Sequence, residues 1–142
     1  ENAYKLHREL GEIMTANVTV VRENESLLET DRKIVELMER YKNIDIEDTQ
    51  TWSNQAVFFT RQLWNMLVLA RVITIGAYNR NESRGAHFKP EFPDRNDEEW
   101  LKTTLAEYQG KTEAPKFTYD PVDISLIPPR KRDYTQKSKG GK

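Results

Sequence analysis

Hydrophobic residues recur at steps of three and four in three separate segments, which is the spacing of one face of a helix. In the first, about residues 3–16, the repeating positions are Tyr4, His7, Leu10 and Ile13/Met14. In the second, about residues 26–43, they are Leu27, Ile34, Val35, Met38 and Tyr41. This second segment starts at the capping-box pattern Ser26-Leu27-Leu28-Glu29, in which both polar side chains can bind free backbone N–H groups. The pattern predicts two amphipathic helices.

The third predicted helix covers about residues 54–79, with Ser53 as a candidate N-cap. From residue 66 to residue 77 it is apolar on nearly every side, which is typical of a helix buried all round. Two amphipathic helices cannot enclose it, so we expect a further covering surface. Its longest apolar stretch, residues 66–78, contains Arg71 and is shorter than the ~20 residues needed to cross a bilayer. The prediction is therefore a core helix and not a membrane span.

Beyond residue 79 the helical period stops. Pro90 and Pro93 exclude regular helix, so residues 80–99 are predicted to be a loop. Residues 100–120 then read as a β-hairpin around a turn-rich centre, and residues 135–142 as a disordered tail. The fold class is thus mainly α: a three-helix bundle, a short hairpin and an extended C-terminal tail. For the β-rich residues 17–21, an extended link and a last helical turn both remain open.

Composition removes several classes of function. The chain has 142 residues, no cysteine and two histidines, so disulfides, thiolate zinc sites and multi-histidine metal sites are excluded. A net charge of −1 argues against general nucleic-acid binding. No glycine-rich phosphate loop occurs, and the acidic run Asp94–Glu99 is typical of a solvated turn or helix start. We therefore assign no catalytic, cofactor-binding or metal-ligating residue.

One segment concentrates chemistry directly after the apolar helix: Glu82, Ser83, Arg84, Gly85 and His87 lie within six residues. The glycine permits a turn with positive φ, and the guanidinium offers a planar fork for a carboxylate or phosphate. Two interpretations remain open. The segment can be a helix-terminal loop whose polar groups satisfy the local backbone, or a contact surface for another part of a larger protein.

Three stretches resemble a known family. They are residues 9–22 (ELGEIMTANVTVVR), residues 82–87 (ESRGAH) with residues 92–95 (FPDR), and residues 100–105 (WLKTTL). In this order they resemble the C-terminal domain of succinate dehydrogenase and fumarate reductase flavoproteins, closest to bacterial succinate dehydrogenase. The resemblance extends over about residues 4–134, and we take residues 1–134 as this domain.

The resemblance implies a structural role within a larger enzyme. The whole flavoprotein would oxidise succinate to fumarate with FAD and pass electrons through an iron–sulfur subunit to quinone in a membrane anchor. It would sit peripherally at the cytoplasmic face of the membrane. The family's FAD and substrate motifs lie upstream, so we expect this chain alone to be soluble, inactive and without bound FAD. Glu82, Ser83, Arg84, Gly85 and His87 match the family's motif and are predicted to contact the flavin domain.

Other interpretations stay open. A free-standing helical adaptor would use the exposed remainder of the third helix as a partner groove, and the isolated chain could self-associate through the same face. The basic residues 130–142 could in principle bind nucleic acid, although a disordered terminus is favoured. The start at Glu1, without methionine, favours a processed product or a fragment. The direction of the reaction and the quinone are not encoded.

Overall fold

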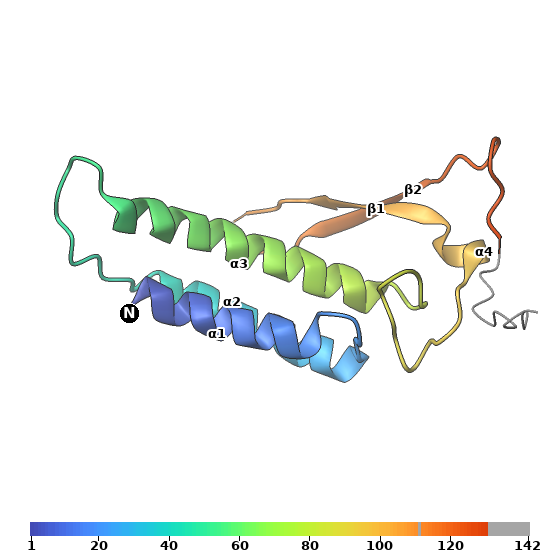
Figure 1. Cartoon of the computed structure of the whole chain (residues 1–142), viewed down its shortest axis with the longest axis horizontal. Coiled ribbons are helices and arrows are strands. Elements are labelled where there is room, and N and C mark those ends of the chain that lie inside the picture. Colours follow the sequence, from blue (N-terminus) through green and yellow to red (C-terminus); the bar gives the residue numbers. More distant parts are fainter. Residues whose placement is uncertain (111, 131–142) are drawn as a thin grey trace, which may run out of the picture.

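The fold consists of three long helices followed by a two-stranded hairpin (Figure 1). The structure, a computed structural model, describes residues 1–110 and 112–130. Its elements are α1 (Ala3–Asn17), α2 (Asn24–Tyr41), α3 (Gln55–Asn79), the single turn α4 (Asp97–Trp100), β1 (Lys102–Glu107) and β2 (Lys116–Pro121). The predicted fold class is confirmed. The tail predicted for residues 135–142 lies outside the described residues.

The core lies between α3 and the α1/α2 pair. Leu6, Leu10, Ile34, Leu63 and Leu67 are almost fully buried in one cluster, which α2 and α3 build together with α1. Leucine and isoleucine at steps of three and four therefore do bring one face of each helix inward. Burial of these side chains is the main source of stability for the bundle.

The inward face of α1 differs from the prediction by one position. Tyr4 is 58% exposed and stacks on Phe59 with ring centroids 4.4 Å apart, and His7 is exposed beside the same ring. The buried positions are instead Ala3, Leu6 and Leu10. Both series have helical spacing, and the one with the aliphatic side chains packs into the core. The aromatic series lies on the flank of the interface.

Both predicted N-caps are wrong. The side chain of Asn54, not Ser53, accepts the Val57 N–H at 3.0 Å, while Ser53 lies outside the helix with φ 56°. The helix α2 starts two residues before Ser26, and its N-cap residue Glu23 makes no side-chain cap bond. The Asn24 N–H is instead bound by the Glu91 carboxylate at 2.7 Å, from a loop 67 residues away. A capping partner so far away in the chain cannot be recognised from the sequence around the helix start.

The expected cover for α3 comes partly from the chain itself. The hairpin lies against α3 on the side away from α1 and α2 (Figure 1). The strands are antiparallel, with Thr104 opposite Tyr119 and Ala106 opposite Phe117. At Gly76 a Cβ would lie 3.3 Å from the Phe117 ring, so the absent side chain lets the hairpin approach closely.

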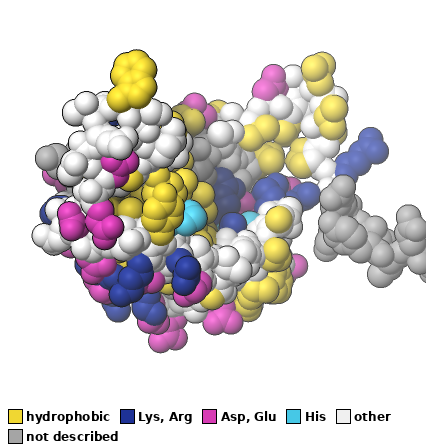
Figure 2. Space-filling view, turned by 60° about the vertical axis from the view of Figure 1, so that its left-hand side comes forward, with side chains coloured by type: hydrophobic (Ala, Val, Ile, Leu, Met, Phe, Trp, Pro, Cys, Tyr) yellow, Lys and Arg dark blue, Asp and Glu magenta, His cyan; other side chains and the backbone are white. Residues whose placement is uncertain are grey.

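A stripe on the outer face of α3 remains uncovered in this chain. Its members, which we call the α3 stripe, are Phe58, Met66, Leu69 and Ile73, between 37% and 60% exposed. Hydrophobic side chains interrupt the charged surface elsewhere too (Figure 2). Among the described residues, α3 is the one helix long and apolar enough to cross a membrane, a criterion that core helices also meet. Arg71 in its middle pairs with Asp31 at 2.9 Å.

Candidate functional site

The segment singled out by sequence lies in loop 80–99, where α1 and α3 end and α2 begins (Figure 1). Residues 84–87 form a tight turn: the Arg84 and His87 backbones exchange N–H···O hydrogen bonds of 2.8 and 3.0 Å. Gly85 adopts φ +62° at the tip of this turn, the conformation expected for it. Of residues 17–21, Asn17 is the last residue of α1, residues 18–20 bend, and Val21 forms a parallel bridge to Phe88, so most of this segment is a link and not a further helical turn.

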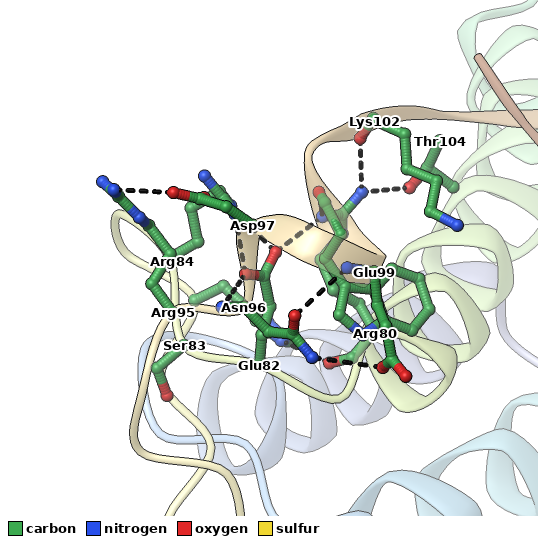
Figure 3. Close-up of polar contacts among 12 residues, drawn as sticks. Arg80, Glu82, Ser83, Arg84, Arg95, Asn96, Asp97, Glu99, Lys102 and Thr104 are labelled. Carbon is green, nitrogen blue, oxygen red and sulfur yellow. Dashed lines mark hydrogen bonds and ion pairs between the residues drawn. The ribbon is translucent and has the colours of Figure 1, made fainter. Parts of the chain in front are cut away.

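The Glu82 carboxylate is the centre of this loop and is fully buried. It accepts two hydrogen bonds from Arg84 at 2.8 and 2.9 Å, one from Arg80 at 2.7 Å and one from the Asn96 backbone N–H at 3.0 Å (Figure 3). Burial alone would raise the pKa of this carboxyl, but these donors outweigh burial and hold the pKa below its ordinary value. The carboxylate stays ionised because both oxygens are bonded.

Arg80 and Arg84 extend the hydrogen-bond network of Glu82 to neighbouring elements. Arg80 also donates to the Trp100 and Lys102 carbonyls at 2.9 and 2.8 Å and to the Thr104 hydroxyl at 2.9 Å, which fastens the hairpin to the loop. Arg84 reaches Asp97 of α4 at 2.7 Å, and Arg95 binds the other oxygen of Asp97 at 2.8 Å (Figure 3). Asp94–Glu99 thus includes a short helix start, as predicted.

Ser83 and His87 satisfy local backbone groups. The Ser83 hydroxyl donates to the Phe92 carbonyl at 2.8 Å and accepts the Lys89 N–H at 2.9 Å. The His87 ring lies 3.0 Å from the Arg80 carbonyl through Nε2 and 2.9 Å from Arg22 Nη1 through Nδ1. Since a carbonyl can only accept and a guanidinium can only donate, the ring is neutral with its proton on Nε2.

Loop 80–99 and the link between α1 and α2 place a charge of the favourable sign at the helix ends around them. Arg22 donates to the Val18 and Thr19 carbonyls after α1, and Lys89 donates to the Tyr78 carbonyl of α3 at 2.7 Å. Glu91 binds the first N–H of α2. Cations at helix C-termini and an anion at an N-terminus complement the helix dipoles. The roles of Arg22 and Lys89 are not predicted from the sequence, because their only local signal is a cation just after a helix or a turn.

Acidic pH should destabilise the fold through His87. Burial lowers the pKa of this histidine, and the charges of Arg22, Lys89 and Arg80 lower it further. The hydrogen bond to the Arg80 carbonyl acts in the opposite direction. A depressed folded-state pKa means that this stabilisation is complete above the unfolded pKa near 6.5 and is lost as pH falls through the folded value.

The comparison is wild type against His87→Asn, whose amide oxygen can still accept from Arg22 but does not titrate. We expect the free energy of unfolding of the wild type to fall more steeply between pH 7 and pH 4.5 than that of the variant, measured by urea denaturation. Parallel curves would contradict the neutral-histidine assignment.

These features define a class: a bundle of three helices closed by a loop that contains a buried ion pair. A family model described as the fumarate reductase flavoprotein C-terminal domain matches residues 7–134. The chain belongs to this family, and the resemblance predicted from its three motifs is confirmed.

Individual relatives agree. The chain is 69% identical over 137 residues to the succinate dehydrogenase flavoprotein subunit of Bacillus subtilis, covering 96% of this chain and 23% of that protein. It is 37% identical to the fumarate reductase flavoprotein subunit of Haemophilus influenzae, covering 94% and 22%. The chain therefore spans less than a quarter of the length of these relatives.

Solved structures give the same picture. The fold matches FrdA of Escherichia coli quinol fumarate reductase with a TM-score of 0.87 at 33% identity, covering 92% of this chain and 23% of that one. Mycobacterium smegmatis Sdh1 matches with a TM-score of 0.76 at 24% identity, which bears on the fold alone.

Proposed function

We propose that this chain is the C-terminal helical part of a succinate dehydrogenase flavoprotein subunit and has a structural role in it. The observation that carries the proposal is the 69% identity to the Bacillus subtilis subunit along 96% of the chain. The whole protein would hold FAD, oxidise succinate to fumarate and deliver electrons to an iron–sulfur subunit and a membrane anchor at the cytoplasmic face. In this proposal the chain itself supplies neither the FAD site nor the substrate site.

The structure supports a docked rather than a free-standing domain. The α3 stripe leaves four large apolar side chains exposed along one helix face, a surface that a monomeric protein usually covers. Relatives more than four times as long offer a cover: the flavin-bearing part of the same polypeptide. Glu82, Ser83, Arg84, Gly85 and His87 are proposed to lie near that part. Since Glu82 is bonded within the chain, the outer atoms of Arg84 and Gly85 would make the contact.

The size of the native polypeptide tests the proposal. An antibody against this chain, used on a lysate of the source cells, should detect a membrane-associated band several-fold heavier than 16.7 kDa. A single band at 16.7 kDa outside the membrane fraction would overturn the proposal and favour the adaptor interpretation.

Arg84→Ala in the full-length flavoprotein should reduce flavin content and complex assembly. The change removes one of the two arginine partners of a buried carboxylate, and breaking such a buried pair typically costs about 3–5 kcal/mol. Ala86→Glu separates docking from folding, because Ala86 is exposed beside Gly85 and leaves the internal hydrogen bonds intact. It should reduce assembly while the unfolding of the 142-residue chain is unchanged. Ala16→Glu, at an exposed position of α1, is the matched control. Normal assembly and flavin content in both Arg84→Ala and Ala86→Glu would contradict the docking of this loop.

A further inference from the structure

A cleft of about 300 Å³ opens between the last turns of α3, the hairpin and loop 80–99. One wall is apolar and is formed by Val72, Ile73 and Phe117. The lining also contains two cations, Arg22 and Arg80, and the neutral ring of His87. An apolar wall and positive charge in one cleft fit a ligand with a short aliphatic chain and one negative head group.

Arg22 is the cation of this cleft whose hydrogen-bond donors are not all used. Its Nε serves the Val18 and Thr19 carbonyls and its Nη1 serves His87, but its Nη2 has no hydrogen-bond partner among residues 1–110 and 112–130. Arg80 differs, because its two Nη atoms are occupied by Glu82, two carbonyls and Thr104. An incoming acceptor would therefore bind Arg22, with Arg80 adding charge.

Arg22 has no carboxylate partner within the described part of the chain. Five other arginines pair with carboxylates: Arg40, Arg71, Arg80, Arg84 and Arg95. The pKa of Arg22 is lowered by burial, with no carboxylate raising it. The nearby Lys89 is fully buried, and its ammonium is opposed by the charge of Glu91. A ligand that brings a negative charge to Arg22 would therefore be favoured.

We propose that this cleft is a carboxylate-binding site in which Arg22 binds the carboxylate and the wall of Val72, Ile73 and Phe117 packs against the attached carbon chain. A carboxylate matches the planar guanidinium, and its aliphatic chain suits the apolar wall better than a strongly hydrated phosphate would. The carboxylate can come from an Asp or Glu side chain of a neighbouring polypeptide segment or from a free aliphatic acid. Only the first source rests on the proposed function.

The test is a titration of the 142-residue chain with propionate, succinate and inorganic phosphate at constant ionic strength, followed by amide NMR shifts. Saturable shifts at Gly76, His87 and Thr104 with both carboxylates, and weaker ones with phosphate, are expected. Arg22→Gln should weaken propionate binding about tenfold, the value of one charge-assisted hydrogen bond. Arg61→Gln, an exposed arginine of α3 outside the cleft, should bind as the wild type does.

The two sources give different results. Succinate binding at least about tenfold tighter than propionate indicates a free dicarboxylate, whereas equal binding indicates a site for one carboxylate and excludes a dicarboxylate as the preferred ligand. Arg22→Lys keeps the charge, removes the fork and should also bind more weakly, which covers the case in which Arg22→Gln does not fold. Absence of saturable shifts in the cleft, or wild-type affinity in both Arg22 variants, overturns the proposal. A native band at 16.7 kDa would contradict the proposed function but would not change what this titration measures.

Discussion

Replacing Glu82 by Ala should lower the free energy of unfolding by about 3–5 kcal/mol, the cost of removing one member of a buried ion pair. The carboxylate is fully buried and accepts four hydrogen bonds. Its loss leaves Arg80, whose side chain is 16% exposed, without a counter-charge. It also frees the Asn96 N–H in a place that water reaches poorly.

Urea denaturation of the 142-residue chain measures this effect. Glu82→Gln keeps the shape and one acceptor oxygen but not the charge, so its loss should be smaller than that of Glu82→Ala. The matched control is Glu29→Ala, which breaks the exposed pair to Lys33 at 2.8 Å on α2. Exposed pairs contribute little, so this control should stay close to the wild type. Equal losses in Glu82→Ala and Glu29→Ala would show that the buried carboxylate does not organise the loop.

The contrast between these two carboxylates shows which ion pairs the sequence predicts and which it does not. Glu29 and Lys33 are four residues apart on one helix, so spacing alone predicts their pairing. Glu82 binds Arg80 and Arg84 two residues to either side, but also Asn96, which is brought back by a loop containing Pro90 and Pro93. No periodicity predicts that return. The polar segment could therefore be recognised, while its internal bonding could not.

The helices show the same limit. The extents of α1 and α3 follow from hydrophobic spacing and were predicted to within one residue at each end. The helix α2 (Asn24–Tyr41) starts and ends two residues earlier than predicted, and its first N–H is bound by Glu91 from loop 80–99. Local patterns identify elements, whereas contacts between distant segments decide their ends. The family resemblance, which rests on long motifs in order, gave the identity that physical reasoning on this loop alone did not.

Alkaline pH should stabilise the wild type relative to Lys89→Met. Lys89 is fully buried, and burial lowers the pKa of its ammonium group from 10.5 to about 8, with Glu91 opposing and Arg22 adding to the effect. The folded state therefore binds this proton more weakly than the unfolded state. The resulting penalty is complete below pH 8 and disappears as pH rises towards 10.5. At about 1.4 kcal/mol for each pKa unit, the change is up to about 3 kcal/mol.

The measurement is the difference in unfolding free energy between wild type and Lys89→Met at pH 7.5 to 10.5. The difference isolates this group, because tyrosines and the other lysines titrate alike in both proteins. Lys33→Met, at an exposed position of α2, is the matched control for the loss of a lysine side chain. A flat difference for Lys89→Met would mean that the fold balances the charge of its ammonium group. A carboxylate bound in the cleft beside Arg22 would weaken the pH dependence only in part, because burial is the largest cause of the lowered pKa of Lys89 and the charge of Arg22 is a smaller one. Repeating the series with saturating propionate therefore measures how a carboxylate in the cleft changes the contribution of Lys89 to the free energy of unfolding.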